Sequence, residues 1–314
     1  MKNILFAIGE ALIDFIPDKT GCDFSDITAF SPKVGGAPAN VLGAFAKLGG
    51  RTQLITQLGN DLFGNKIIKE LSEFGIGLDY VTVTDAANTA LAFVSLDNSG
   101  DREFSFYRNP SADMLCTAEN ITAAELEDCY ALHFCSVSLG NFPMKKAHTR
   151  VIELAKKNGA VISFDPNIRL PLWKDKSELK SAIKEFLPYA DIVKVSEDEV
   201  ELVTGETDAE KGCRRLLESA ELVLCTCGSH GAYAYTKSCS VFVPSKKVAV
   251  KDTTGAGDAF CGSLLYGLYS SGVGRGELGM LTEERLAELV GASVNYCAES
   301  VQRYGAIESY PYSL

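Results

Sequence analysis

Short apolar runs alternate with longer segments of helical spacing along most of this 314-residue chain. The apolar runs are residues 4–8, 53–58, 131–137, 160–164, 191–195 and 222–227, and the helical segments are 39–48, 65–74, 144–158, 177–187 and 209–219. Runs that are apolar throughout are typical of parallel strands buried on both faces, which helices must then cover. The pattern therefore predicts repeated strand–helix units and an α/β fold around a mostly parallel sheet.

Two strand-like stretches stand outside this alternation, residues 11–17 and residues 91–108, and a turn over 97–101 interrupts the second. They predict a small, separate sheet. No segment rich in Pro, Gly or Ser divides the chain, and no internal repeat is present. We therefore expect a single domain over residues 1–314, with a β lid contributed by about 11–34 and 89–110.

Composition excludes several classes of partner. The chain has 41 acidic and 30 basic residues and a net charge of -11, which argues against nucleic acid or an anionic membrane as the main partner. No apolar run reaches the ~18 residues that a spanning helix needs, and no long signal region follows Met1, so a cytoplasmic location is expected. The 10 cysteines form no Cys-x-x-Cys pair and the 3 histidines lie far apart, which disfavours a zinc site.

The run Asp252-Thr-Thr-Gly-Ala-Gly-Asp258-Ala-Phe260 precedes a segment of helical spacing. The N–H groups of Gly255, Ala256 and Gly257 would then be the unpaired donors of a helix start, where the helix dipole favours an anion such as phosphate. Asp258 would lie one turn inside, close enough to take the proton of an attacking alcohol. A second interpretation stays open, in which Asp258 only favours the helix dipole and the glycines only permit tight packing.

A second helix start is predicted after Gly35 and Gly36, which would let a ligand approach the backbone. The amide of Asn40 offers both a donor and an acceptor to the hydroxyl groups of a polyol. Asp14 lies between two apolar neighbours on one face of its predicted strand, so its carboxylate needs donors such as sugar hydroxyls. The alternatives are an ordinary turn into an amphipathic helix, and an Asp14 that faces water from a sheet edge.

Three motifs resemble those of one family, the ribokinase-like (PfkB) carbohydrate kinases. Residues 252–260 are similar to its C-terminal signature, and residues 35–40 together with Gln57-Leu-Gly-x-Asp61-x-x-Gly64 are similar to its N-terminal signature. No Walker A loop or dinucleotide-binding motif is present. Within the family, residues 106–115 and 164–173 most resemble segments of fructokinases. The resemblance implies a three-layer α/β fold with a central, mostly parallel sheet flanked by helices and a small β lid.

The resemblance also implies the residues of a sugar site. Those that would contact the sugar are Asp14, Gly35, Gly36 and Asn40, with Tyr107 and Arg108 reaching in from the lid. Arg169 carries a fixed charge that would meet the transferring phosphoryl group or the sugar. For Arg108 and Arg169, a surface ion pair is the alternative interpretation.

On the nucleotide side, Lys194 to Glu199 occupies the place where the family carries Asn-x-x-Glu, with Ser196 at the Asn position. Glu199 would be linked to magnesium, through water. The residues expected beside the nucleotide are Lys194, Thr226, Gly228, Gly231 and Asn295. Asp252 and Thr254 resemble a loop for a monovalent cation such as potassium, which backbone near 305–309 would complete.

Together these features predict a kinase that transfers the γ-phosphoryl group of ATP, with Mg²⁺, to a ketohexose, most simply the 6-hydroxyl of fructose. Asp258 would be the general base, and Gly255, Ala256 and Gly257 would form the anion hole. Other acceptors (2-keto-3-deoxygluconate, ribose, a nucleoside) and a catalytically inactive sugar or nucleotide sensor are the alternatives. Apolar lid strands would pair two subunits into a homodimer.

Overall fold

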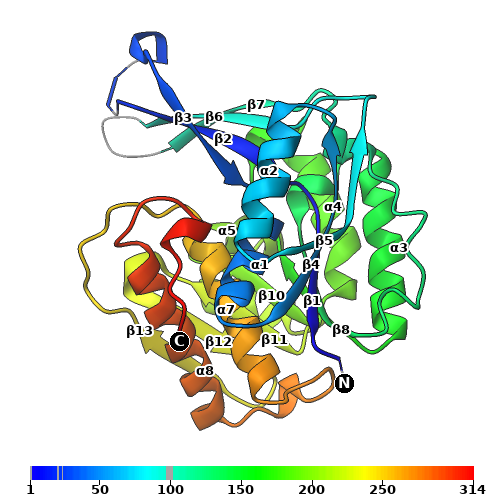
Figure 1. The fold of residues 1–314 in the computed structure, drawn as a ribbon. Helices are drawn as coiled ribbons and strands as arrows, with labels where there is room; N and C mark the ends of the chain where they lie inside the picture. Colours follow the sequence, from blue (N-terminus) through cyan, green and yellow to red (C-terminus); the bar gives the residue numbers. More distant parts are fainter. Residues whose placement is uncertain (1, 20, 23, 97–101) are drawn as a thin grey trace.

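A computed structural model describes residues 2–19, 21–22, 24–96 and 102–314. Its centre is a nine-stranded sheet with the strand order β13-β12-β11-β10-β9-β8-β1-β4-β5 (Figure 1). All neighbouring pairs from β11 to β5 are parallel, and β12 and β13 form an antiparallel hairpin at one edge. The predicted α/β fold with a mostly parallel sheet is confirmed.

Six strands of the large sheet, β1, β4, β8, β9, β10 and β11, lie close to the predicted apolar runs. The bounds of all nine strands are β1 Ile4–Ile8, β4 Arg51–Gly59, β5 Gly77–Thr84, β8 Cys129–Cys135, β9 Val161–Asp165, β10 Ile192–Ser196, β11 Leu222–Thr226, β12 Gly231–Tyr235 and β13 Ser240–Pro244. Strands β5, β12 and β13 were not predicted. The residues of β5 are half-buried or exposed because it is an edge strand, so its apolar pattern is weak.

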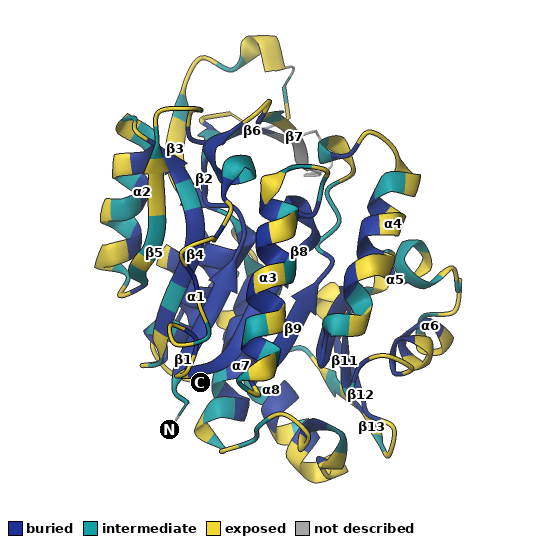
Figure 2. Ribbon diagram, turned by 90° about the vertical axis from the view of Figure 1, so that its right-hand side faces the viewer, coloured by how far each residue is buried: buried dark blue, intermediate teal, exposed yellow. Residues whose placement is uncertain are grey.

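Helices cover both faces of this sheet (Figure 2). On β1, Leu5 and Ala7 join the core under α1 (Ala37–Lys47), α2 (Leu62–Glu73), α7 (Ala256–Ser270) and α8 (Glu283–Ser300). Phe6 and Ile8 join the opposite core, under α3 (Pro143–Lys157), α4 (Lys176–Phe186), α5 (Glu197–Thr204) and α6 (Ala209–Leu216). The molecule therefore has three layers.

A second sheet of four strands, here called the small sheet, projects from one end of the molecule (Figure 1). Its order is β3-β2-β6-β7, with β2 Leu12–Pro17, β3 Phe30–Gly35, β6 Leu91–Leu96 and β7 Arg102–Tyr107. Both predicted lid stretches are thus strands, and the predicted turn at 97–101 lies outside the described residues. Only three residues separate β2 from β1, so the small sheet begins at the carboxyl end of a central strand.

One face of the small sheet is aromatic. The Phe15 ring stacks on Phe93 with centroids 4.6 Å apart, and Phe30 meets Phe93 edge-on at 5.3 Å. Phe63 at the start of α2 packs against the same Phe15 ring at 5.7 Å. The opposite face, which carries Asp14, therefore faces the carboxyl ends of the central strands. Within the described ranges, no helix is long and apolar enough to cross a membrane.

Candidate active site

A cavity of about 690 Å³ lies between the small sheet and the carboxyl ends of the central strands. Open α/β sheets bind ligands at this edge, because strand ends and helix starts converge there. The starts of α1, α5 and α7 all contribute to its wall. The predicted site residues that line it are Asp14, Gly36, Asn40, Arg169, Lys194, Glu199, Thr226, Gly228, Thr254, Gly255, Ala256, Gly257 and Asp258.

The predicted anion hole lies at the first turn of α7. Gly255 is the N-cap, with a left-handed φ of 71° that favours glycine, and α7 begins at Ala256. One detail differs from the sequence analysis, because the N–H of Ala256 already donates to the Thr253 carbonyl at 3.2 Å. A Cβ on Gly257 would lie 3.1 Å from the Lys194 Nζ, so the missing side chain leaves the lysine close to this turn.

Asp258 is 9% exposed and lies on the cavity side of α7. Its Oδ2 accepts a hydrogen bond of 2.8 Å from Nδ2 of Asn40, which is 218 residues earlier in the chain. Burial raises the pKa of Asp258 to about 6, and the nearby Asp165 adds to the rise, against the lowering effects of Asn40 and Lys194. A carboxylate with this pKa is ionised at neutral pH and basic enough to accept a proton from an alcohol under attack.

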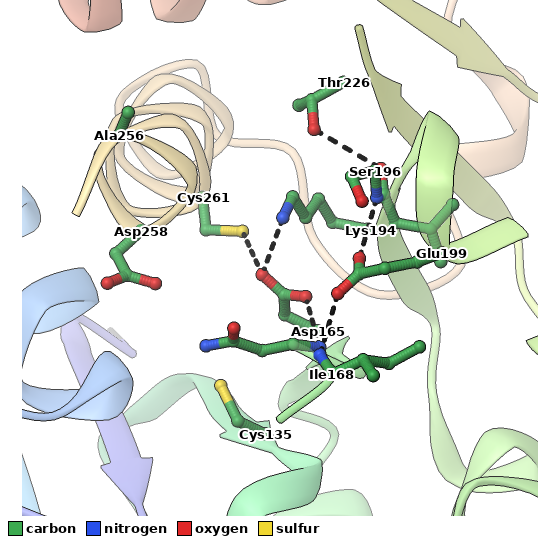
Figure 3. A network of polar contacts seen from close by, with 12 residues as sticks. Cys135, Asp165, Ile168, Lys194, Ser196, Glu199, Thr226, Ala256, Asp258 and Cys261 are labelled. Carbon is green, nitrogen blue, oxygen red and sulfur yellow. Dashed lines mark hydrogen bonds and ion pairs between the residues drawn. The ribbon is translucent and has the colours of Figure 1, made fainter. Parts of the chain in front are cut away.

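Asp165, at the end of β9, is a site residue that the sequence analysis missed. Its Oδ2 forms a buried ion pair with Lys194 Nζ at 3.0 Å, and the Cys261 thiol approaches the same oxygen at 3.9 Å (Figure 3). Burial lowers the pKa of Lys194, but Asp165 and then Glu199 outweigh it and raise the pKa overall. The available signal was its position, directly after the apolar run 160–164 at a strand's carboxyl end.

Glu199 lies in the first turn of α5 and is held by two backbone groups. Its Oε2 accepts from the Ser196 N–H at 2.8 Å, and its Oε1 accepts from the Ile168 N–H at 2.7 Å (Figure 3). Ser196 is the N-cap of the helix, so serine at the family's Asn position serves the helix start. Glu199 thereby joins α5 to the loop after β9.

The end of the cavity predicted to bind the sugar is formed around β2 and the start of α1. Gly36 is the N-cap of α1 with φ of 111°, and a Cβ there would lie 2.5 Å from the Glu10 carbonyl oxygen. Gly35 does not line the cavity, but a side chain on it would collide with the carboxylate of Asp14. The Oδ1 of Asn40 is buried and has no hydrogen-bond partner within the described part of the chain. This acceptor points to a polar ligand.

Two residues predicted to reach the sugar from the lid lie elsewhere in this structure. Tyr107 is 64% exposed and packs edge-on against Phe93, on the aromatic face of the small sheet. Phe106 lines the cavity instead, because successive side chains of a strand point to opposite faces. Arg108 is buried in a close ion pair with Asp113, so it neither lines the cavity nor forms the surface ion pair of the alternative interpretation.

The remaining residues predicted for the nucleotide and cation sites do not line the cavity. Gly231 has φ of 126° and packs on the backbone of β13, and neither it nor Asn295 of α8 lines the cavity. Asp252 is also outside the lining, but its Oδ1 accepts from the Thr254 N–H at 2.9 Å and its Oδ2 from the Gly305 N–H at 2.9 Å. It thus joins the two segments of the predicted cation loop.

Arg169 follows the Asp165 loop and lines the cavity. One of its guanidinium nitrogens donates to the Ile168 carbonyl at 3.1 Å, and its charge lowers the pKa of Asp258.

No group of three or more His, Cys, Asp or Glu side chains that could bind a metal occurs in the ranges that the structure describes.

An anion site at a helix start, a buried carboxylate beside it and a polar recess for hydroxyl groups define an α/β enzyme suited to phosphoryl transfer onto an alcohol. The chain belongs to the pfkB family of carbohydrate kinases, whose profile matches residues 2–312. It is therefore a carbohydrate kinase, as the sequence motifs predicted.

Relatives and solved structures agree with this assignment. Fructokinase-1 of Zea mays is 39% identical over 313 residues, which are 99% of this chain and 95% of that protein. The structure of a fructokinase from Xylella fastidiosa with bound ATP has a TM-score of 0.89 and 33% identity, covering 99% of this chain and 96% of that one. A fructokinase double mutant from Vibrio cholerae, in a form with fructose, ADP and potassium ion bound, has a TM-score of 0.83 and 30% identity, covering 99% and 96% of the two chains.

Proposed function

We propose that this carbohydrate kinase transfers the γ-phosphoryl group of ATP to the 6-hydroxyl of fructose, with Asp258 as the general base. The observation that carries the proposal is the hydrogen bond between Asp258 and Asn40. It joins the anion site of α7 to the polar recess of α1, so one carboxylate faces both the phosphoryl group and the hydroxyl. The fructokinase relatives support fructose as the acceptor.

In the proposed reaction, Asp258 accepts the proton of the sugar hydroxyl while the hydroxyl oxygen bonds to the γ-phosphorus. The bond from that phosphorus to the bridging oxygen breaks, and ADP leaves with the electron pair. N–H groups at the first turn of α7 donate to the phosphoryl oxygens, where charge develops. Asp14, Gly36 and Asn40 hold the sugar, and Arg169 and Lys194 add positive charge beside the reacting group.

Oxygen donors at the phosphate end suit a magnesium ion. Glu199 and Asp165 are carboxylates on this wall of the cavity, and hard cations prefer such ligands. Both oxygens of Glu199 already accept backbone N–H groups, which favours a contact through water. Bound magnesium would supply charge neutralisation of the β- and γ-phosphates. We assign the potassium loop to Asp252 and Thr254 with backbone after Gly305.

We further propose that residues 1–314 work as one kinase domain in which the small sheet is a lid. Val94 and Phe106 line the cavity from the small sheet, so its closure over the sugar would exclude water from the phosphoryl group. The opposite face carries the aromatic rings of Phe15, Phe30 and Phe93 and the exposed Tyr107. We assign this face to a homodimer contact through the lid, which size measurements on Tyr107→Ser would test by a shift to monomer.

The acceptor is tested by an ADP-release assay with ATP, magnesium and fructose, ribose, 2-keto-3-deoxygluconate, glucose or adenosine. Fructose is expected to give the highest kcat/KM, and NMR of the product should place the phosphate on carbon 6. A higher kcat/KM for another acceptor would leave the kinase but refute fructose as its substrate. ATP binding without turnover on any acceptor would favour the sensor instead.

A further inference from the structure

The C-terminal segment lies directly behind the first turn of α7. Tyr310 is fully buried, and its hydroxyl donates to the Gly255 carbonyl at 2.8 Å. That carbonyl also accepts the helical N–H of Ala259 at 2.7 Å, so both of its lone pairs are used. The hydroxyl approaches so closely that a Cβ on Gly255 would collide with it. The segment is drawn in red beside α1 and α8 in Figure 1.

The next carbonyl along the chain has a similar partner. The thiol of Cys297, on α8, donates to the Ala256 carbonyl at 3.2 Å. Two consecutive carbonyls at the start of α7 are therefore contacted from behind, one by a hydroxyl from the C-terminal segment and one by a thiol from α8.

These two contacts reach the anion hole through rigid peptide planes. The carbonyl of Gly255 shares one plane with the N–H of Ala256, and the carbonyl of Ala256 shares the next with the N–H of Gly257. In a trans peptide the two groups point in opposite directions, so fixing the carbonyl fixes the direction of the N–H. We infer that Tyr310 and Cys297 are positioning residues for the anion hole. Cys297 aims the Gly257 N–H at the transferring phosphoryl group, and Tyr310 fixes the neighbouring Gly255–Ala256 peptide, whose N–H closes the turn on the Thr253 carbonyl. The inference rests on the proposed role of these N–H groups.

The segment that carries Tyr310 is itself held by the last residue of α1. Lys47, at the end of α1, donates from Nζ to the Tyr310 carbonyl at 3.0 Å and to the Glu308 carbonyl at 3.2 Å. The ammonium also lies 4.7 Å from the ring centre of Tyr312. Tyr310 thus bridges the helix that carries Asn40 and the turn that forms the anion hole.

Both positioning groups keep their protons at working pH. Burial raises the pKa of Tyr310 well above its usual range and raises the pKa of Cys297 to about 12. Each is therefore a hydrogen-bond donor wherever Asp258 is ionised. A preorganised donor loses little energy in reorganising when charge develops on the phosphoryl oxygens.

Tyr310→Phe tests the inference, because it removes only the hydroxyl. Deleting a direct oxyanion donor costs about 10²-fold or more in kcat, so loss of a group that aims such donors is expected to lower kcat by about tenfold. The KM for fructose and the Kd for ATP should stay within about twofold, because these report ground-state binding. Aluminium fluoride bound with ADP and fructose mimics the phosphoryl group in the transition state. Affinity for this mimic should fall in parallel with kcat.

Tyr296→Phe is the matched control. It also removes a buried tyrosine hydroxyl, which donates to the Pro311 carbonyl of the same segment at 2.9 Å but does not reach α7. It should cost similar stability and leave kcat unchanged. For the thiol, Cys297→Ala should lower kcat, and Cys297→Ser, which keeps a donor, should restore it.

Equal kcat and equal affinity for the mimic in Tyr310→Phe and Tyr296→Phe would overturn the inference, provided that Asp258→Asn is inactive in the same assay. If Asp258→Asn instead turns over normally, the proposed function fails, and the inference fails with it.

Discussion

At the scale of single residues, the site depends on charges that are buried and mutually dependent. Asp258 lies among the carboxylate of Asp165, the ammonium of Lys194 and the guanidinium of Arg169, and each of them shifts its pKa. Asp165 raises it, and the two cations lower it. Burial is the largest cause of the raised pKa of Asp258, and these neighbouring charges adjust it in opposite directions.

The raised pKa of Asp258 gives a pH prediction. Its value of about 6 lies above the usual 3.8, so the folded protein binds this proton more tightly than the unfolded chain. Stability from this group is present below about pH 4 and is lost as the pH rises through 6. Asp258→Asn should therefore raise the melting temperature relative to wild type at pH 8, and raise it less at pH 5.5. An equal difference at both pH values would contradict the shifted pKa.

Ionisation of Asp258 lowers stability but should be required for activity. The carboxylate must be ionised to accept a proton, so kcat/KM is expected to fall below pH 6 with an apparent pKa near that of Asp258. Arg169→Lys keeps the charge and should leave this acid limb in place, whereas Arg169→Met should move it to higher pH because a cation is lost. An acid limb that stays fixed in Arg169→Met would show that another group sets it.

At the scale of elements, two helices start at the cavity with glycine N-caps that have positive φ. Gly36 begins α1 and Gly255 begins α7, each packed against another part of the chain. The sequence was sufficient to predict both helix starts, because Gly-rich turns before a helical period are local signals. It was not sufficient to predict the Asp165–Lys194 pair or the Tyr310 contact, since these join segments that only the folded sheet brings together.

Gly255→Ala tests the first turn of α7. The new Cβ would meet the Tyr310 hydroxyl in addition to the cost of a left-handed alanine, which is about 1 kcal/mol. We expect a loss of stability above that amount, with a fall in kcat of at least tenfold. Gly75→Ala is the control, because Gly75 has φ of 79° and nothing within 4 Å of its missing Cβ. Equal losses of stability in urea unfolding would show that the Tyr310 contact is unimportant.

At the scale of the whole molecule, the small sheet and the three-layer body share the cavity between them. The sequence predicted the body well, because strands buried on both faces leave long apolar runs. It predicted β2, β6 and β7 of the small sheet but not β3, and it placed Tyr107 and Arg108 at the sugar. Alternation along β7 turns Tyr107 to the aromatic face, and Asp113, a few residues later, holds Arg108 in a buried pair. A buried ion pair of this kind leaves no periodic pattern in the sequence.

The buried pair at the end of β7 gives a prediction about how the small sheet is held to the body. Asp113→Asn would remove the ion-pair partner of the buried Arg108, whose charge the Glu10 carboxylate would then offset only in part, and is expected to cost up to about 3–5 kcal/mol of unfolding free energy. Glu185→Gln breaks the more exposed pair with Lys145 and should change stability by less than about 1 kcal/mol. Urea unfolding compares the two, and similar values would mean that Arg108 does not depend on Asp113.

The most direct test of the central claim is the turnover of Asp258→Asn at saturating fructose and ATP with magnesium. The variant keeps an oxygen that can accept the Asn40 hydrogen bond, so it should fold and bind both substrates with KM values within a few-fold of wild type. We predict a fall in kcat of at least ~100-fold, because the proton acceptor is lost. Turnover close to wild type in a folded variant would contradict Asp258 as the base.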